Sequence, residues 1–151
     1  MLERHLHWIA AAEVKVGVVI AIDTGLLGAL AAALNGNRAT GHIFLGQVCS
    51  FLAAILLGAA IVCAAMTVLP RVEGPPSSMI FFGRIAAKAK EEFAREFIDA
   101  KAADFLVDCL AQIHRNAEIA CEKFKWVRRG MWCSFLGAPF WAVAIASLVK
   151  A

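Results

Sequence analysis

The chain has 151 residues, and 61% of them are hydrophobic, whereas soluble domains usually hold about half. Its mean hydropathy is +0.71 and its formal net charge is only +3. These values argue against an ordinary water-soluble domain and favour a chain that lies in a lipid bilayer. The length predicts a single domain.

Three stretches are long and apolar enough to cross a bilayer, which requires roughly 20 apolar residues. They are residues 16–34, 43–69 and 130–149. Asp23 is the only charge inside the first, and the other two carry none. Pro139 interrupts the third, where membrane helices tolerate proline. Because the N-terminus mixes acidic and basic residues and the apolar core is long, a retained first helix is favoured over a cleaved signal peptide.

Two different connections join the predicted spans. Residues 35–42 (NGNRATGH) are a polar turn. The turn is so short that the two helices it joins must form a hairpin. Residues 69–78 (LPRVEGPPSS) break the second helix with proline and glycine.

The segment from Met79 to Arg129 is charged but still helix-forming. It carries two apolar stripes at helical spacing: Ile85, Ala89, Phe93 and Phe97, and then Phe105, Cys109, Leu110, Ile113, Ala117, Ala120, Phe124 and Val127. The stripes predict a helical hairpin with a bend near residues 99–103. No strong breaker precedes the third span, so the second helix is expected to continue into it.

Charge asymmetry predicts the orientation. Of the fifteen Lys and Arg residues, eleven lie between the second and third spans, and positive residues favour the cytoplasmic side. We therefore expect an all-α membrane protein with three transmembrane helices and a cytoplasmic helical hairpin between the second and third. Its parts are an N-terminal interfacial segment with a transmembrane hairpin (1–69), the cytoplasmic hairpin (70–129) and the third transmembrane helix (130–151). The N-terminus is expected in the cytoplasm and the C-terminus outside.

Catalytic and metal-binding patterns are missing from the sequence. It has no Ser-His-Asp arrangement with a supporting motif, no phosphate-binding glycine loop and no H-E-x-x-H. The five cysteines form no C-x-x-C pair and are interpreted as small apolar residues. We expect no enzymatic activity, no cofactor and no metal.

Asp23 is the most informative polar residue, because a charge near the bilayer centre costs about 2.5–3.5 kcal/mol on insertion scales. Three roles compete: a hydrogen bond across an oligomer interface, a pore-lining group, or a proton relay. The small residues Thr24, Gly25 and Gly28 beside it suit close helix packing. Interhelical bonding is therefore the leading interpretation, and pore lining is the second.

Charged residues also mark the inner membrane boundary. Glu13 and Lys15 are two apart, so they do not pair with each other on a helix. Arg128 and Arg129 lie at the matching depth of the third span and are candidate partners for Glu13; simple anchoring, with Lys15 extended to the interface, is the alternative. The residues predicted to act in membrane assembly are Glu13, Lys15, Asp23, Arg128 and Arg129.

Three separated motifs are informative through their order and spacing along the chain. They are Ala12–Val16 (AEVKV) with Asp23 and Thr24 after it, Phe81–Ala86 (FFGRIA) with Phe93 after it, and Asp108–Lys123 with Gln112, Ile113, Ala117 and Ile119. Together they resemble the transmembrane effectors of Pycsar anti-phage defence, over nearly the whole chain. Glu13 stands where the family usually has Asp, and Asp23 where it usually has Asn. An amide at that position supports interhelical bonding over a proton relay.

The resemblance implies a signalling role. In such systems a pyrimidine cyclase responds to phage by making cyclic UMP or cyclic CMP, and the effector senses that nucleotide and impairs the bacterial inner membrane. The implied partners are the lipid bilayer, a cyclic pyrimidine mononucleotide, the cyclase and further copies of the chain in a homo-oligomer; no nucleic acid polymer is expected.

Four residues could meet the needs of such a ligand. Arg84 and Lys123 supply cations for the phosphate, Phe82 an aromatic face and Gln112 an amide, if the hairpin folds back or a neighbouring subunit contributes. From the residues alone, the two phenylalanines of the FFG motif indicate a membrane anchor or a plain core. The alternative functions are a constitutive holin-like pore former and a membrane scaffold that binds a cytoplasmic protein partner.

Overall fold

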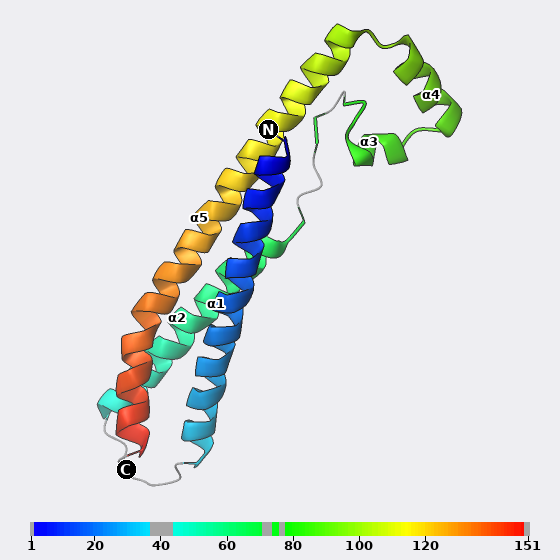
Figure 1. Cartoon of the computed structure of the whole chain (residues 1–151). Helices are drawn as coiled ribbons and strands as arrows, with labels where there is room; N and C mark the ends of the chain where they lie inside the picture. Colours follow the sequence, from blue (N-terminus) through cyan, green and yellow to red (C-terminus); the bar gives the residue numbers. More distant parts are fainter. Residues whose placement is uncertain (1, 37–43, 71–73, 76–77, 150–151) are drawn as a thin grey trace. The chain divides into compact units, whose positions relative to one another are not determined.

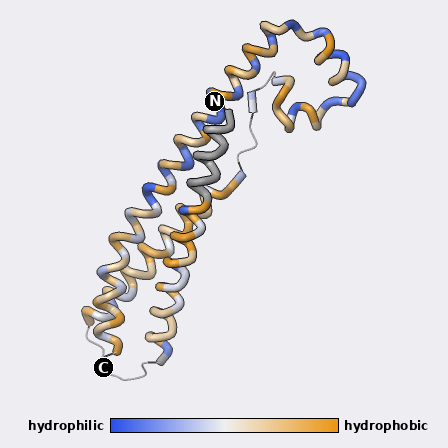
Figure 2. The backbone as a smooth tube through the Cα atoms, in the orientation of Figure 1, coloured by the Kyte–Doolittle hydropathy of each residue, from blue (hydrophilic) through white to orange (hydrophobic). Residues whose placement is uncertain are grey.

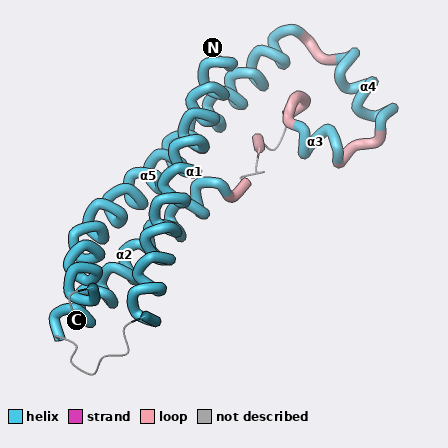
Figure 3. Tube along the Cα trace, turned by 60° about the horizontal axis from the view of Figure 1, so that its bottom comes forward, coloured by secondary structure: helices cyan, strands magenta, loops and turns pink. Residues whose placement is uncertain are grey.

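The computed structural model describes residues 2–36, 44–70, 74–75 and 78–149, with side chains from Val14 onward. These residues form α1 (Leu2–Gly36), α2 (Phe44–Val68), α3 (Phe82–Ala86), α4 (Lys90–Asp99) and α5 (Ala102–Val149) (Figure 1). Throughout the described ranges the chain is helix, turn or loop, with no strand (Figure 3). The predicted all-helical class is confirmed. Most of the predicted polar turn at 35–42 and part of the 69–78 connection lie outside the described residues.

Three of the helices are long and apolar enough to cross a membrane, as predicted. They contain Val14–Asn35, Phe44–Val68 and Ala102–Val149. Figure 2 shows α2 and the C-terminal half of α5 coloured mainly as hydrophobic. Pro139 lies inside α5 without ending the helix.

The chain divides into two compact units. One comprises Ala10–Leu69 and Lys123–Ala151 and is called the bundle unit below; the other comprises Met1–Ile9 and Pro70–Glu122 and is called the turn unit. The bundle unit contains all three apolar stretches.

In the bundle unit, α2 buries residues at alternating spacings of three and four. The buried positions of α2 include Gly46, Ser50, Ala53, Leu57, Ala60, Ala64 and Thr67. This average repeat of 3.5 is typical of left-handed helix packing, and the small residues allow close approach of the backbones. At Gly137 of α5, an added Cβ would lie only 3.2 Å from atoms of Leu57. The glycine is therefore a direct contact point between α5 and α2.

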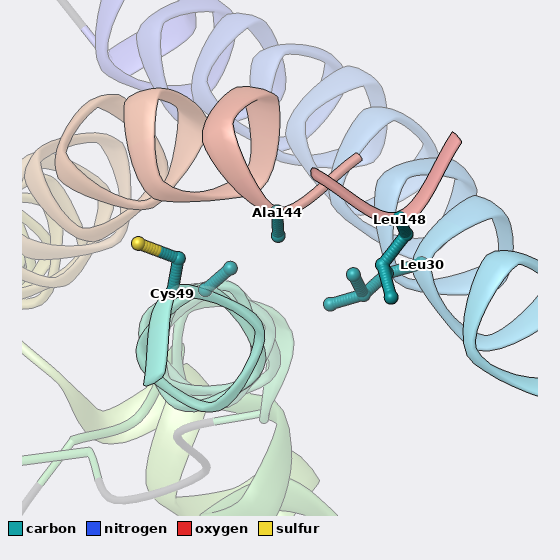
Figure 4. Close-up of a cluster of buried hydrophobic side chains, with 5 residues drawn as sticks. Leu30, Cys49, Ala144 and Leu148 are labelled. Carbon is teal, nitrogen blue, oxygen red and sulfur yellow. The ribbon is translucent and has the colours of Figure 1, made fainter. Parts of the chain in front are cut away.

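One end of the bundle holds a small apolar core. Figure 4 shows Leu30 of α1, Cys49 of α2, and Ala144 and Leu148 of α5 gathered together, and Ala53 belongs to the same cluster. Nearby, the indole Nε1–H of Trp141 donates a hydrogen bond of 2.8 Å to the carbonyl oxygen of Leu26. Since α1 is tied to α5 by both apolar and polar contacts here, the three helices form a packed bundle within one chain.

In the turn unit, aromatic side chains link α4 to the start of α5. The ring centroids of Phe97 and Phe105 lie 6.2 Å apart in an edge-to-face arrangement, and those of Phe93 and Phe97 lie 5.8 Å apart. The break between the helices falls at Ala100 and Lys101, inside the bend expected at 99–103.

The first apolar stripe is not one continuous helix. Residues 87–89 are non-helical and separate α3 from α4, and Ala89 has an extended backbone. The stripe from Ile85 to Phe97 is therefore divided between two helices. No glycine or proline stands in residues 84–90, so helix propensity does not account for the break.

Candidate functional site: the turn before helix α3

A buried carboxylate holds the turn that precedes α3. Asp108 of α5 is only 6% exposed, and its Oδ2 accepts hydrogen bonds from the backbone N–H groups of Met79 (2.7 Å) and Ile80 (3.1 Å). Hydrogen bonds to a charged acceptor contribute about 1.5–3 kcal/mol each. Asp108 therefore fixes the path of the chain directly before the FFG motif.

A buried hydroxyl completes this arrangement. Ser78 Oγ accepts hydrogen bonds from the backbone N–H groups of Ile80 (3.3 Å) and Phe81 (3.0 Å). Gln112 Nε2 of α5 donates to the same oxygen at 2.8 Å. Ser78, Asp108 and Gln112 are called the turn clasp below, because they join the turn to α5 through side chains.

The FFG motif has a packing role as well as an exposed ring. The ring of Phe81 lies over Gly74 and Gly83, and an added Cβ at Gly83 would lie 2.8 Å from it. Phe82 is 63% exposed, and its ring centroid lies 4.7 Å from that of Phe81. One phenylalanine thus packs against the glycines, while the other presents an aromatic face to the surroundings.

The predicted ligand residues are not gathered into one site within either unit. Phe82 and Arg84 are both exposed on α3, but they are two residues apart, so they point in different directions around the helix. Gln112 belongs to the same unit and is engaged in the turn clasp. Lys123 belongs to the bundle unit, is only 8% exposed and takes part in an interaction of its own. The four-residue set stays a prediction.

The predicted assembly residues have varied surroundings. Asp23 is 1% exposed, and its Oδ2 accepts a hydrogen bond of 2.7 Å from Ser134 Oγ of α5. This bond joins two helices of the same chain. Lys15, Arg128 and Arg129 are exposed, and the guanidinium of Arg129 lies 4.9 Å from the ring centroid of Trp126. The side chain of Glu13, and with it the predicted pairing to an arginine, lies outside the described residues.

The small residues near Asp23 do not share its buried face. Thr24, Gly25 and Gly28 are exposed, and a Cβ added at either glycine would meet nothing within 4 Å. Within the chain, the small-residue contacts are instead made by Gly137 of α5 and the buried positions of α2.

The Asp23–Ser134 bond gives a measurable prediction. Asp23→Asn keeps the acceptor and should change the unfolding free energy by less than about 0.5 kcal/mol, whereas Asp23→Leu should lose about 0.6–1.7 kcal/mol, the range for interhelical hydrogen bonds in membranes. Denaturation of the purified protein in mixed micelles measures both. If the bond is real, Ser134→Ala should cost much less in the Asp23→Leu background than alone; additive losses would contradict it.

Ser78 was not singled out from the sequence, and Asp108 was named only as the first residue of the third motif, without a role. Ser78 closes a Pro/Ser-rich connection, where a hydroxyl that bonds the backbone two or three residues later is a common turn device. Asp108 belongs to the polar face of the predicted helix, opposite the apolar stripe, where a carboxylate is usually exposed. The signal for Ser78 was local and readable, but the role of Asp108 depends on a contact across 28 and 29 residues of sequence.

Comparison with known proteins identifies the family. The Pycsar effector protein domain (PycTM) matches residues 1–149. Over 140 residues the chain is 28% identical to the Pycsar effector protein PtPycTM of Propioniciclava tarda, an alignment that covers 86% of this chain and 68% of that protein. No solved structure matches the chain significantly. With a match over almost its whole length and three helices able to cross a membrane, the chain belongs to the Pycsar effector family, the transmembrane effectors of anti-phage defence.

Proposed function

We propose that this chain senses cyclic UMP or cyclic CMP and, in response, oligomerises and impairs the bacterial inner membrane. The observation that carries the proposal is the family match over residues 1–149, because it includes both the apolar spans and the FFG segment. A Pycsar effector implies a cyclic nucleotide signal made by a cyclase. In this proposal, residues 1–69 and 130–151 act in the membrane, and residues 70–129 receive the nucleotide in the cytoplasm.

The turn before α3 supports the ligand part of the proposal. A pyrimidine nucleotide offers a flat base, and the exposed ring of Phe82 provides a surface on which a base can stack. Arg84 supplies a planar cation suited to a phosphate. Because these two side chains point in different directions, they would contact separate parts of one nucleotide or belong to sites in neighbouring copies.

The amide of Gln112 suits the base edge. Its Nε2–H donates a hydrogen bond to Ser78 Oγ. Its carbonyl oxygen receives no hydrogen bond from the described residues and can accept one from an N–H group of the base. Lys123 fits direct ligand contact least, since it is buried and already engaged. The proposal therefore rests on Phe82, Arg84 and Gln112 before Lys123.

Titration of the purified protein tests the binding step. Cyclic UMP and cyclic CMP are titrated separately by calorimetry, with cyclic AMP as the control. We expect saturable binding of at least one pyrimidine and a weakening of at least tenfold in Phe82→Ala or Arg84→Gln. A folded sample that binds neither pyrimidine would contradict the ligand assignment.

Expression in cells separates the alternatives. The proposed effector depolarises the inner membrane only when a pyrimidine cyclase is produced with it. Depolarisation from the chain alone would support a constitutive holin-like pore. No depolarisation with the cyclase, together with a protein partner recovered on pull-down, would support a scaffold.

Labelling of the native residue Cys121 tests the proposed orientation, so no cysteine has to be introduced. The Cys121 side chain is exposed on α5 in the turn unit. A membrane-impermeant maleimide should therefore label it in inside-out vesicles and not in intact spheroplasts. Cys121→Ser is the control that identifies the labelled residue, and labelling from the outside would contradict a cytoplasmic position for residues 70–129.

A further inference from the structure

A row of exposed cations lies on the side of α5 that faces away from the bundle. Lys125, Arg128 and Arg129 are exposed, as is Trp132 one turn later, whereas Gly130 and Gly137 are buried against α2. At 3.6 residues per turn, the four exposed side chains share one side of the helix. They form a basic stripe at the start of the third apolar stretch.

Lys15 lies at the same level of the bundle. It is exposed on α1 and stands directly beside Val16, which lines a small apolar void together with Val127 and Gly130 of α5. Two helices therefore carry exposed cations at one end of the bundle unit. Lys15, Lys125, Arg128 and Arg129 are called the basic belt below.

The basic belt has no acidic partner in the described bundle. Asp23 is the only carboxyl among the side chains described in residues 14–69 and 123–149, and it is buried against Ser134. None of the salt bridges found among the described residues includes a member of the belt. These four cations are therefore available to an anion that the chain does not itself supply.

The residues around the basic belt indicate which kind of anion it binds. Trp132 is exposed beside the cations, and the guanidinium of Arg129 packs over the Trp126 ring. Beyond Trp132 the exposed surface of α5 is apolar, with Phe135 and Leu136. Cations and tryptophans bordering an apolar span are typical of the headgroup level of a bilayer. We propose that the basic belt binds the headgroups of anionic phospholipids and so gives this effector a preference for anionic membranes.

Tryptophan quenching in vesicles tests this proposal with the full chain. The protein is reconstituted in phosphatidylcholine containing either brominated phosphatidylglycerol or brominated phosphatidylcholine, and the relative association of the two lipids is obtained from the quenching. Each cation near an anionic surface strengthens the association about fivefold. We expect a clear preference in the native chain and a loss of at least tenfold in the triple variant Lys125→Gln, Arg128→Gln, Arg129→Gln.

A matched triple variant removes the same charge elsewhere. Lys90→Gln, Arg95→Gln and Lys101→Gln lie in the turn unit and should keep the preference; circular dichroism confirms that both triples remain helical. Equal quenching by the two lipids in the native chain would overturn the proposal, as would an equal loss in the control triple. Displacement of the anionic lipid by inorganic phosphate or by a cyclic nucleotide would overturn it too, because the cations would then serve a soluble anion.

Discussion

Asp108→Ala is expected to release the turn before α3 and to weaken the response to the nucleotide about tenfold. The substitution removes the acceptor of two backbone N–H groups, each bond being worth about 1.5–3 kcal/mol. Hydrogen exchange of the Met79 and Ile80 amides should therefore rise at least tenfold. The nucleotide concentration for half-maximal depolarisation should rise by a similar factor, because Phe82 and Arg84 lose their fixed position.

Two variants separate this effect from a general loss of charge. Asp108→Asn keeps an oxygen that accepts hydrogen bonds and should show a smaller effect than alanine. Asp99→Ala removes an exposed carboxylate at the end of α4 and should leave exchange and response unchanged. If Asp108→Ala exchanged at the native rate, or if Asp99→Ala weakened the response equally, the turn clasp would not be what positions these residues.

Gly137→Leu is expected to force α5 away from α2. Even a Cβ at this position lies 3.2 Å from Leu57 and from the Cβ of Leu56, so the whole leucine side chain finds no space. Overpacking of this kind costs about 1–3 kcal/mol and occasionally more. Unfolding of the purified protein in mixed micelles, followed by circular dichroism, measures the loss.

Gly17→Leu is the matched control in α1. This glycine is exposed, and an added Cβ meets nothing within 4 Å. The control should be neutral or slightly stabilising, since leucine has the higher helix propensity by roughly 0.8 kcal/mol. Equal destabilisation by the two variants would show that leucine harms any glycine position in these helices, and the proposed contact between α5 and α2 would be wrong.

The gross architecture was predictable because it depends on properties of contiguous segments. Three apolar stretches of sufficient length predict three spanning helices, and the apolar periodicity of residues 105–127 predicts the helix that precedes the third span. The bend before Ala102 was predicted from the end of one stripe and the start of the next. Each of these predictions needs only the hydropathy and spacing of neighbouring residues.

The side-chain arrangement was harder to predict because it depends on partners far away in the sequence. Which face of α1 would be buried could not be decided from its small residues: Asp23 faces α5, while Gly25 and Gly28 are exposed. Small residues do not single out the packed face of α2 either, since Ala54 and Ala65 are exposed while Ala53 and Ala64 are buried. The pairing of Asp108 with the backbone of residues 79–80 has no local signature at all.

Vesicle leakage tests the central claim, a membrane effector that answers a cyclic pyrimidine nucleotide, most directly. The purified chain is reconstituted into dye-loaded vesicles containing anionic phospholipid, and cyclic UMP, cyclic CMP or cyclic AMP is added to vesicles in which Cys121 is accessible. We expect dye release with cyclic UMP or cyclic CMP and none with cyclic AMP or without nucleotide. Release that is independent of nucleotide, or no release with either pyrimidine from a correctly inserted helical sample, would contradict the account.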